Sequence, residues 1–157
     1  MYHLNRNHQI KVITENRKVR YEYFIEDNYE AGIVLLGTEV KSLRMGKSNL
    51  RDSYAKITNG EIFVHNVHIA TYPFAHYENH DPNRLKKLLL HKREIRKLYS
   101  KINEKGYTLI PTKIYFQNGH IKISLGLAKG KRHYDKRATI RQRDQKRALD
   151  RERKKYQ

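Results

Sequence analysis

The sequence contains no cysteine, so it has neither a disulfide framework nor a thiolate zinc site. Long hydrophobic runs are also missing, because the longest one, GIVLLG at residues 32–37, is far too short to span a bilayer. The first 16 residues, MYHLNRNHQIKVITEN, lack the apolar block of a secretory signal. We therefore expect an intracellular, cytoplasmic protein with no membrane partner.

Acidic residues are scarce: 16 Asp and Glu stand against 34 Lys and Arg, which gives a formal net charge of +18. Such an imbalance costs stability through self-repulsion and indicates a polyanionic partner, with nucleic acid favoured over a membrane surface. Residues 129–157 hold 13 basic and 4 acidic side chains, a net +9, so half of the charge lies in the last 29 residues. We expect two parts, a globular body over 1–128 and a basic tail over 129–157.

Strand and hairpin patterns dominate the body. QIKVIT at 9–14 is typical of a first strand, and two β-rich runs in 52–70 flank Asn59-Gly60, a strong hairpin signal. The runs 107–116 and 120–127 predict a second hairpin that turns at 117–119.

Helical spacing appears at two places. Residues 16–27 fit a short amphipathic helix, and residues 80–106 fit one long helix with Asp81 as N-cap, Pro82 in the first position and Gly106 after its end. Between them, residues 30–46 predict a strand that bends at Gly32 and Gly37 and continues as a second extended piece.

This order of elements is typical of an oligonucleotide-binding (OB) fold, a small antiparallel barrel. We therefore predict a mainly β protein, an OB-like antiparallel barrel with about three helices packed on it. One helix on an open antiparallel sheet is the alternative.

The tail has few apolar residues and cannot offset roughly 1–2 kcal/mol of backbone entropy per residue. It lacks Pro and has no Gly after Gly130, and it is rich in good helix formers whose like charges repel one another. We expect it to be disordered when free and to fold on RNA.

Signatures of chemistry are weak. MGKS at 45–48 has Lys41 where a phosphate loop needs its first glycine. His65 and His68 lie three apart on a strand and face opposite sides, and Pro73 breaks the segment in which His76 and His80 could meet on a helix. Glu30, Glu39 and Asp52 have no recognisable nucleophile or base beside them, so we expect no enzyme activity, no cofactor and no metal site.

Basic clusters point to phosphate binding instead. Lys41, Arg44 and Lys47 surround a glycine turn, and together with the basic face of the 80–106 helix they favour a continuous phosphate-binding surface over a merely solvated one. Tyr134, amid tail cations, either stacks on an unpaired base or tucks back onto the barrel; the residues alone leave both open.

Four long motifs carry a family resemblance over nearly the whole chain, from about Lys11 onward. They are NRKVRYEYFIEDNYEAGIVLLGTEVKSLRMGK, DPNRLKKLLLHKREI, EKGYTLIPTKIYF and GLAKGKRHYDKR. The sequence resembles the SmpB family of bacterial SsrA-binding proteins. The resemblance implies an OB barrel that binds the tRNA-like domain of transfer-messenger RNA and delivers it to stalled ribosomes for trans-translation, which tags the nascent peptide for degradation.

The same resemblance assigns candidate RNA-binding residues in the body. They are Asn16, Arg17, Lys18, Glu30, Gly32, Glu39, Lys41, Ser42, Arg44, Gly46, Lys47, Lys86, Lys87 and Leu89. Asn16 to Lys18 are grouped with Glu30 and Gly32 as one region, and residues 39–47 form the other.

In the tail, the resemblance implies that the segment enters the decoding region and messenger channel of the small ribosomal subunit, where Tyr134 stacks on a base. The candidate ribosome-binding residues are Lys129, Lys131, Arg132, Tyr134, Asp135, Lys136, Arg137, Ile140, Arg141 and Arg143. Beyond Ile140 the sequence has Gln142 and Asp144 where many relatives carry a glutamate-centred block, but the basic helical character is kept, so we expect this stretch, with Arg141 and Arg143, to keep its role.

The implied partners are transfer-messenger RNA and the ribosome, and the shared RNA is compatible with a contact to elongation factor Tu. We expect a monomer. A ribosomal or ribosome-assembly protein is the alternative, and an RNA-cleaving or RNA-modifying enzyme is a second rival.

Overall fold

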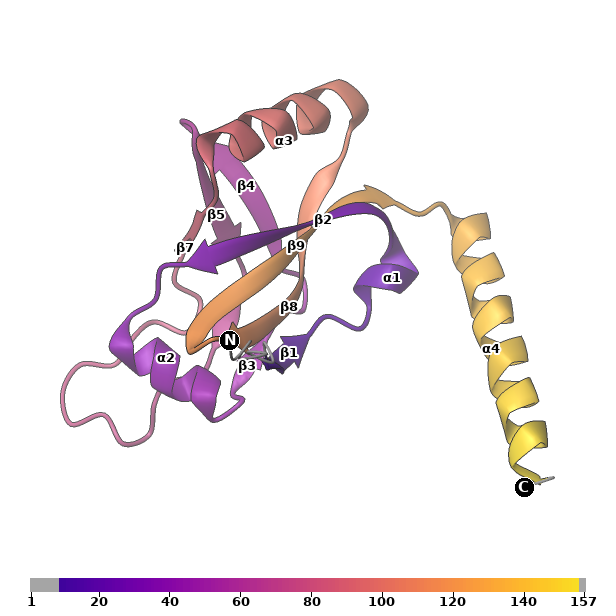
Figure 1. Ribbon diagram of the computed structural model, residues 1–157, viewed down its shortest axis with the longest axis horizontal. Coiled ribbons are helices and arrows are strands. Elements are labelled where there is room, and N and C mark those ends of the chain that lie inside the picture. The colour runs from indigo at the N-terminus through magenta and orange to yellow at the C-terminus, as the bar shows by residue number, and fades with distance from the viewer. Residues whose placement is uncertain (1–8, 156–157) are drawn as a thin grey trace, which may run out of the picture.

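The computed structural model describes residues 9–155. Its strands wrap into a barrel, α3 lies across one end, α2 lies near the other, and α4 projects away from the body (Figure 1). In chain order the elements are β1 (Ile10–Glu15), α1 (Val19–Glu22), β2 (Tyr23–Ile33), α2 (Gly37–Arg44), β3 (Ser48–Asn49), β4 (Tyr54–Thr58), β5 (Glu61–His65), β6 (His68–Ile69), β7 (Lys86–Leu89), α3 (Lys92–Lys105), β8 (Thr108–Gln117), β9 (His120–Gly130) and α4 (His133–Lys155).

The main sheet is antiparallel and closed. Its strand order in the described part of the chain is β1-β8-β4-β5-β7-β2-β9, and the additional β8–β9 pairing joins the two sides. The long β2–β9 ladder runs from Tyr23↔Gly130 to Gly32↔Lys122. The expectation of a mainly β, OB-like barrel is confirmed, and the open sheet is excluded because closure leaves the barrel strands without a free edge between β8 and β9.

Both predicted hairpins are confirmed at their turns. Asn59 and Gly60 have φ of 51° and 74°, and Asn118 and Gly119 have φ of 51° and 78°. A two-residue turn with both φ positive matches the right-handed twist of the strands, and Asn and Gly tolerate that conformation best. The first strand is confirmed as β1.

The single long helix predicted over 80–106 is wrong in its first half. Residues 86–89 form β7, which pairs with β2 and β5, and α3 begins only at Lys92. The leucines fit either a helical or a strand period, but the barrel needs a strand between β5 and β2. Gly106 ends α3 with φ of 65°, as predicted.

Two further boundaries differ from the prediction. The helix at 16–27 is only the single turn α1, after which Tyr23 starts β2. The second extended piece predicted after Gly37 is wrong, because residues 37–44 form the helix α2. The Glu39 carboxylate accepts a hydrogen bond from the Leu36 N–H at 2.7 Å, which caps that helix and favours it over an extended chain.

The core fills the barrel and continues under its helices. Leu43 of α2 and Ile95 and Leu98 of α3 join the buried strand residues in one cluster. Val19 of α1 packs in a smaller cluster with Ile110. Burying such side chains is the main stabilising term of the body, at about 1.5–3 kcal/mol for each fully buried aliphatic residue.

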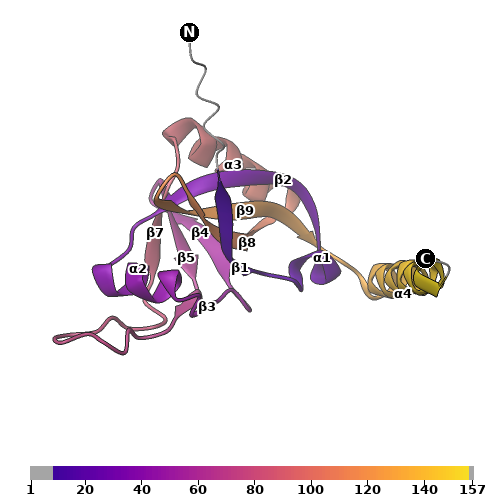
Figure 2. The same ribbon diagram turned by 60° about the horizontal axis from the view of Figure 1, so that its bottom comes forward.

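The helix α4 stands apart from this core and has no buried residue. In Figure 2 it is seen nearly end-on, beyond α1 and the end of β9. β9 reaches Gly130, two residues past the boundary expected at 128, so the tail leaves from the barrel's closing strand. That the tail is disordered when free stays a prediction.

Candidate nucleic-acid interface

One candidate surface lies on the outer face of β2, β7 and β9. Glu30, Gly32, Leu89 and Lys122 line a shallow depression of about 340 Å³ together with the start of α3. Leu89 is 54% exposed, although it is a leucine on a strand. A Cβ on Gly32 would lie 3.2 Å from the Leu89 Cβ, so the glycine lets Leu89 pack against the β2 backbone.

Glu30 is held as a charged acceptor on this surface. Its carboxylate oxygens accept hydrogen bonds from Lys122 Nζ and from the Tyr115 hydroxyl, both at 2.5 Å. The bond from Lys122 and then that from Tyr115 lower the pKa of the Glu30 carboxyl. Burial first, and the bond to Glu30 second, raise the pKa of Tyr115. Glu30 can accept N–H or O–H groups of a base or ribose, and Lys122 can contact a phosphate.

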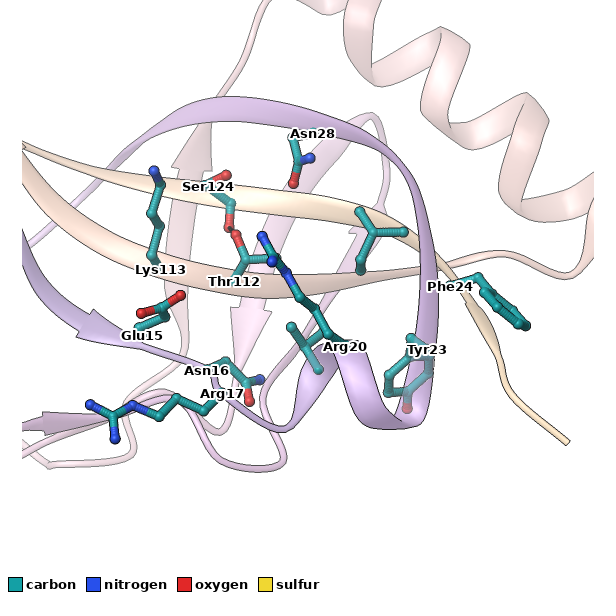
Figure 3. Close-up of a pocket in the computed structure, with 12 residues that line it drawn as sticks. Glu15, Asn16, Arg17, Arg20, Tyr23, Phe24, Asn28, Thr112, Lys113 and Ser124 are labelled. Atoms are coloured by element: carbon teal, nitrogen blue, oxygen red, sulfur yellow. Dashed lines mark hydrogen bonds between the residues drawn. The ribbon is translucent and has the colours of Figure 1, made fainter. Parts of the chain in front are cut away.

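A second candidate surface is a groove of about 770 Å³ beside α1 (Figure 3). Arg20 reaches across it toward Thr112 and Ser124, and Arg17 lines its edge with the guanidinium group pointing outward. The Asn16 amide nitrogen donates to the carbonyl oxygens of Leu50 (3.4 Å) and Pro111 (3.3 Å). Asn16 therefore braces the groove wall, and the cations Arg17 and Arg20 are the groups free to meet phosphate.

The residues Asn16, Arg17 and Lys18, predicted to form one region with Glu30 and Gly32, lie in different hollows of the surface from those two residues. Asn16 and Arg17 line the α1 groove, and Lys18 lines a neighbouring hollow that also includes Asn16. Glu30 and Gly32 lie toward the far end of β2, beside β7. The two places lie along the same strand, because the α1 groove reaches Asn28 and Ser124, and Ser124 pairs with Glu30.

A third surface is formed by α2 and the turn after it. Lys41, Arg44 and Lys47 are exposed, and the turn is made by Gly46 with φ of 71°. Within residues 9–155, none of these three cations is part of an ion pair. They are therefore available to phosphates, and their contact with RNA stays a prediction.

Three predicted contact residues are wrong as direct RNA contacts, because Glu39, Ser42 and Lys86 have no solvent-exposed surface. The Ser42 hydroxyl donates to the Ala70 carbonyl at 2.6 Å. Lys86 Nζ donates to the carbonyl oxygens of Arg84 (2.8 Å) and Val67 (3.0 Å) and lies 3.8 Å from Glu39 Oε1. These side chains hold α2 on the barrel beneath the exposed cations.

Glu39 is the centre of that buried network. Arg84 donates to both carboxylate oxygens, at 2.8 and 3.1 Å. Burial by itself would raise the pKa of Glu39, but the hydrogen bonds from Arg84 and the Leu36 N–H outweigh it and lower the pKa. Burial lowers the pKa of the Lys86 ammonium, against the opposing pull of Glu39. Lys87, next in sequence, points outward and donates to Glu61 at 2.6 Å.

The base of the tail is attached to the body at Lys131. Its backbone N–H donates to Glu22 O at 2.9 Å, and its Nζ donates to Arg20 O and to Thr139 Oγ1 at 2.8 and 2.9 Å. The same ammonium lies 4.7 Å from the centre of the Phe24 ring. Lys131 thus joins β9, α1 and the second turn of α4.

Some of the remaining tail residues make contacts within the chain, and the others are exposed to solvent. The Asp135 carboxylate accepts the Arg132 N–H at 3.2 Å and caps the helix. Tyr134 is 65% exposed, so it does not tuck back onto the barrel and its ring is open for stacking. Ile140 and Lys136 are half-buried near α1, and the other predicted tail residues are exposed: Lys129, Arg132, Arg137, Arg141 and Arg143.

Sequence reasoning missed Lys122 and Arg20, and it placed Arg84 on the basic face of the helix predicted over 80–106 instead of beside Glu39. Lys122 is in the alternating run HIKISLGL as an outward-facing cation, and this signal was available. The pairing of Arg84 with Glu39 joins residues 45 positions apart, which no local pattern reveals. Over the described residues no cluster of His, Asp and Glu could hold a metal ion, and no helix there is long and apolar enough to cross a membrane.

Comparisons with known proteins agree on one family. The SmpB protein family model matches residues 13–155. The SsrA-binding protein of Geobacter sulfurreducens is 58% identical over 139 residues, covering 88% of this chain and 91% of that protein. The SsrA-binding protein of Bacillus subtilis is 52% identical over 141 residues, covering 90% of each. A solved chain described as "tmRNA-SmpB: a journey to the center of the bacterial ribosome" is 49% identical with a TM-score of 0.65, covering 82% of this chain and 94% of that one. The chain therefore belongs to the SmpB protein family.

Proposed function

We propose that this chain binds the tRNA-like domain of transfer-messenger RNA with its barrel and delivers that RNA to stalled ribosomes for trans-translation. The nascent peptide is then tagged for degradation. The observation that carries the proposal is the division of the molecule into a rigid barrel with exposed polar and cationic surfaces and a 23-residue helix with no buried residue. Its relatives are SsrA-binding proteins, and the similar solved chain is described with tmRNA and the ribosome.

The barrel is suited to a folded RNA. Phosphates and ribose hydroxyls of a structured RNA lie at fixed positions, so a rigid protein surface can recognise them by shape. Glu30 with Lys122, the Arg17 and Arg20 groove and the α2 cations Lys41, Arg44 and Lys47 supply the acceptors and charges. Leu89 supplies an exposed apolar contact beside them.

The tail is suited to a narrow polyanionic channel. Its helix is about 35 Å long at 1.5 Å per residue and is exposed along its length beyond Ile140. In this proposal, Tyr134 near the start of the helix stacks on a base in the decoding region of the small subunit, and the following arginines contact ribosomal phosphates. The site of action is the ribosome in the cytoplasm, and the protein acts as an adaptor without catalysis of its own.

The test separates the two parts of the molecule. A chain that ends at Arg132 lacks α4 but keeps all of β9 and the Lys131–Glu22 bond. Its affinity for the tRNA-like RNA should stay within about threefold of the full chain, whereas peptide tagging on stalled ribosomes should be lost. Unchanged tagging would contradict the role of the tail.

A substitution on the barrel tests the RNA-binding part of the proposal. Lys122→Met should weaken RNA binding by about tenfold, because it removes a charge-assisted contact and frees Glu30. Lys56→Met, which removes an exposed lysine from β4, is the matched control. Equal binding by a ribosomal RNA fragment of similar size would favour a ribosome-assembly protein instead.

A further inference from the structure

Among the described residues, the longest connection that contains no helix or strand joins β6 to β7 and presents aromatic side chains to solvent. Within its residues 70–80, here called the aromatic loop, Phe74 is 66% exposed and Tyr77 is 95% exposed. Figures 1 and 2 both show this segment leaving the barrel beside α2. Exposing large apolar rings to water is unfavourable in free energy, and binding a partner that covers them removes this cost.

The base of the aromatic loop is firmly held. The Asn79 side chain makes two hydrogen bonds with the Tyr72 backbone, accepting its N–H at 3.1 Å and donating to its carbonyl oxygen at 2.7 Å. His80 is buried, with its ring nitrogens 2.8 Å from Thr38 Oγ1 and 2.9 Å from Ile69 O. The exposure of the rings is therefore built into an ordered loop.

The start of the aromatic loop is hydrogen-bonded to α2 and to the turn after it. Ser42 Oγ donates to Ala70 O, and the Ala70 N–H donates to Lys47 O at 3.0 Å. Lys41 Nζ lies 5.4 Å from the centre of the Tyr72 ring, which in turn meets Phe74 edge-on at 5.6 Å between centroids. Cations from α2 and rings from the loop thus form one continuous surface.

The charges on this surface favour a polyanion. Lys41, Arg44 and Lys47 lack ion-pair partners within residues 9–155, as described above. The loop and its continuation to Arg84 carry two carboxylates, Glu78 and Asp81, and Asp81 already accepts the Asn83 N–H at 2.9 Å. Aromatic rings stack on unpaired bases while neighbouring cations contact phosphates, and this combination is typical of single-stranded nucleic-acid sites.

We propose that the aromatic loop and α2 form a clamp for unpaired nucleotides of the RNA that the barrel binds. Phe74 and Tyr77 stack on bases, and Lys41, Arg44 and Lys47 contact the adjoining phosphates. The identity of that RNA, the tRNA-like domain of transfer-messenger RNA, rests on the proposed function. The clamp itself rests on the geometry of the loop.

The test compares loss of the rings with their exchange. Phe74→Ala/Tyr77→Ala should weaken binding of the tRNA-like RNA by at least about fivefold, since each stack contributes substantially to such complexes. Phe74→Tyr/Tyr77→Phe keeps both rings and should bind within about twofold of the unchanged chain. The slope of log affinity against log salt concentration should be unchanged in both variants. Lys41→Ala should make that slope less steep by about 0.7–0.9, because it removes one phosphate contact.

Photocrosslinking of the full chain to the RNA locates the contact. With short-wavelength irradiation, peptides from residues 70–80 should carry crosslinked nucleotides from unpaired segments. Binding by the alanine variant equal to that of the unchanged chain, with crosslinks only elsewhere, would overturn the clamp. Loss of ribosome binding with RNA affinity unchanged would overturn it as well, because the loop would then serve a different partner.

Two controls keep these outcomes separate. If the unchanged chain does not bind the tRNA-like RNA, the proposed function fails before the clamp is tested, and crosslinking to an unstructured oligonucleotide then decides the clamp alone. If the double alanine variant melts at a lower temperature, Tyr77→Ala decides the stacking question, because a 95% exposed ring contributes little to folding.

Discussion

Glu39 and Lys86 form an ion pair inside the body, where neither side chain is exposed. Removing one member of a buried pair leaves the other charge without compensation, at a cost of about 3–5 kcal/mol. Glu39→Gln should therefore lower the free energy of unfolding by about 3 kcal/mol or more, measured by urea denaturation. Lys86→Met should cost less, because Arg84 and the Leu36 N–H still compensate Glu39.

The double variant Glu39→Gln/Lys86→Met should be no less stable than Glu39→Gln alone, since the uncompensated cation is gone. Lys87→Met is the matched control, because its ion pair with Glu61 is exposed and contributes at most about 1 kcal/mol. Additive losses in the double variant would show that Glu39 and Lys86 are not coupled.

Glu30 gives the barrel a pH dependence of known sign. Its folded-state pKa is lowered from an ordinary value of about 4.5 by Lys122 and Tyr115. The stability that it contributes is present above about pH 4.5 and is lost as the pH falls through the folded-state value. Glu30→Gln should be less stable than the unchanged chain at pH 7, by a small amount because the side chain is about half exposed.

That difference should shrink in urea titrations as the pH is lowered below 4.5, when the unchanged chain also loses the charge. Tyr115→Phe, which removes one of the two donors to Glu30, should show a reduced version of the same pattern. A stability difference that is constant from pH 7 to pH 3 would contradict the assigned role of the Glu30 charge.

Individual residues also mark what the sequence could reveal. Asn59-Gly60 and Asn118-Gly119 were recognisable because their φ values are a local property. The burial of Lys86 was not, because an amphipathic pattern assigns lysine to the surface, and only the distant Glu39 makes an interior position tolerable. For the same reason, motif matching placed Glu39, Ser42 and Lys86 at the RNA surface when they lie beneath it.

At the scale of elements, the contacts of α4 with the rest of residues 9–155 are made by its first turns. Lys131 bridges Arg20 O and Thr139 Oγ1, and Lys136 lies 5.9 Å from the Tyr21 ring centre. Lys131→Met should speed amide hydrogen exchange in residues 133–140 by severalfold, because it removes both bridging hydrogen bonds. The melting temperature of the barrel should stay within a few degrees.

Lys129→Met is the control for this experiment, since Lys129 is exposed and lies two residues earlier on β9. Equal exchange rates in the Lys131→Met variant and the unchanged chain would mean that the bridge does not order the start of α4. Fast exchange throughout α4 in both proteins would be the result expected from a tail that is disordered when free.

Helices and strands were predictable where the apolar residues fit the spacing of only one of them, and unpredictable where the apolar residues fit both. The β8–β9 hairpin alternates over many residues, so its pattern is unambiguous. The run of residues 85–90 contains four leucines that fit either a helix or a strand, and pairing with β2 and β5 decides for β7. α2 was missed because its cap depends on Glu39, whose carboxylate is also bound by Arg84.

For the whole molecule, the uneven distribution of charge predicts two salt dependences. Residues 133–157 carry ten basic and four acidic side chains. For binding to the tRNA-like RNA, the slope of log affinity against log salt concentration should be equal for the full chain and for a chain that ends at Arg132. For binding to the ribosome, this slope should be steeper by about 2 for the full chain than for the shortened chain, which corresponds to about three phosphate contacts.

A variant with Tyr134→Ala in the full chain distinguishes charge from stacking. It should weaken ribosome binding without changing the salt slope, because it removes a ring and no charge. Equal slopes for the full and shortened chains on the ribosome would show that the tail cations do not neutralise ribosomal phosphates.

The pairing of Tyr23 with Gly130 joins residues more than a hundred positions apart, and this has a consequence for how the molecule forms. Barrels dominated by such distant pairings fold slowly, and this one cannot close until its last strand is available. A chain cut short before β9 would leave β2 and β8 with unsatisfied edges and would be prone to aggregate. β9 is both the strand that closes the barrel and the strand from which the tail continues. A chain that ends before β9 therefore lacks a closed barrel and the tail together.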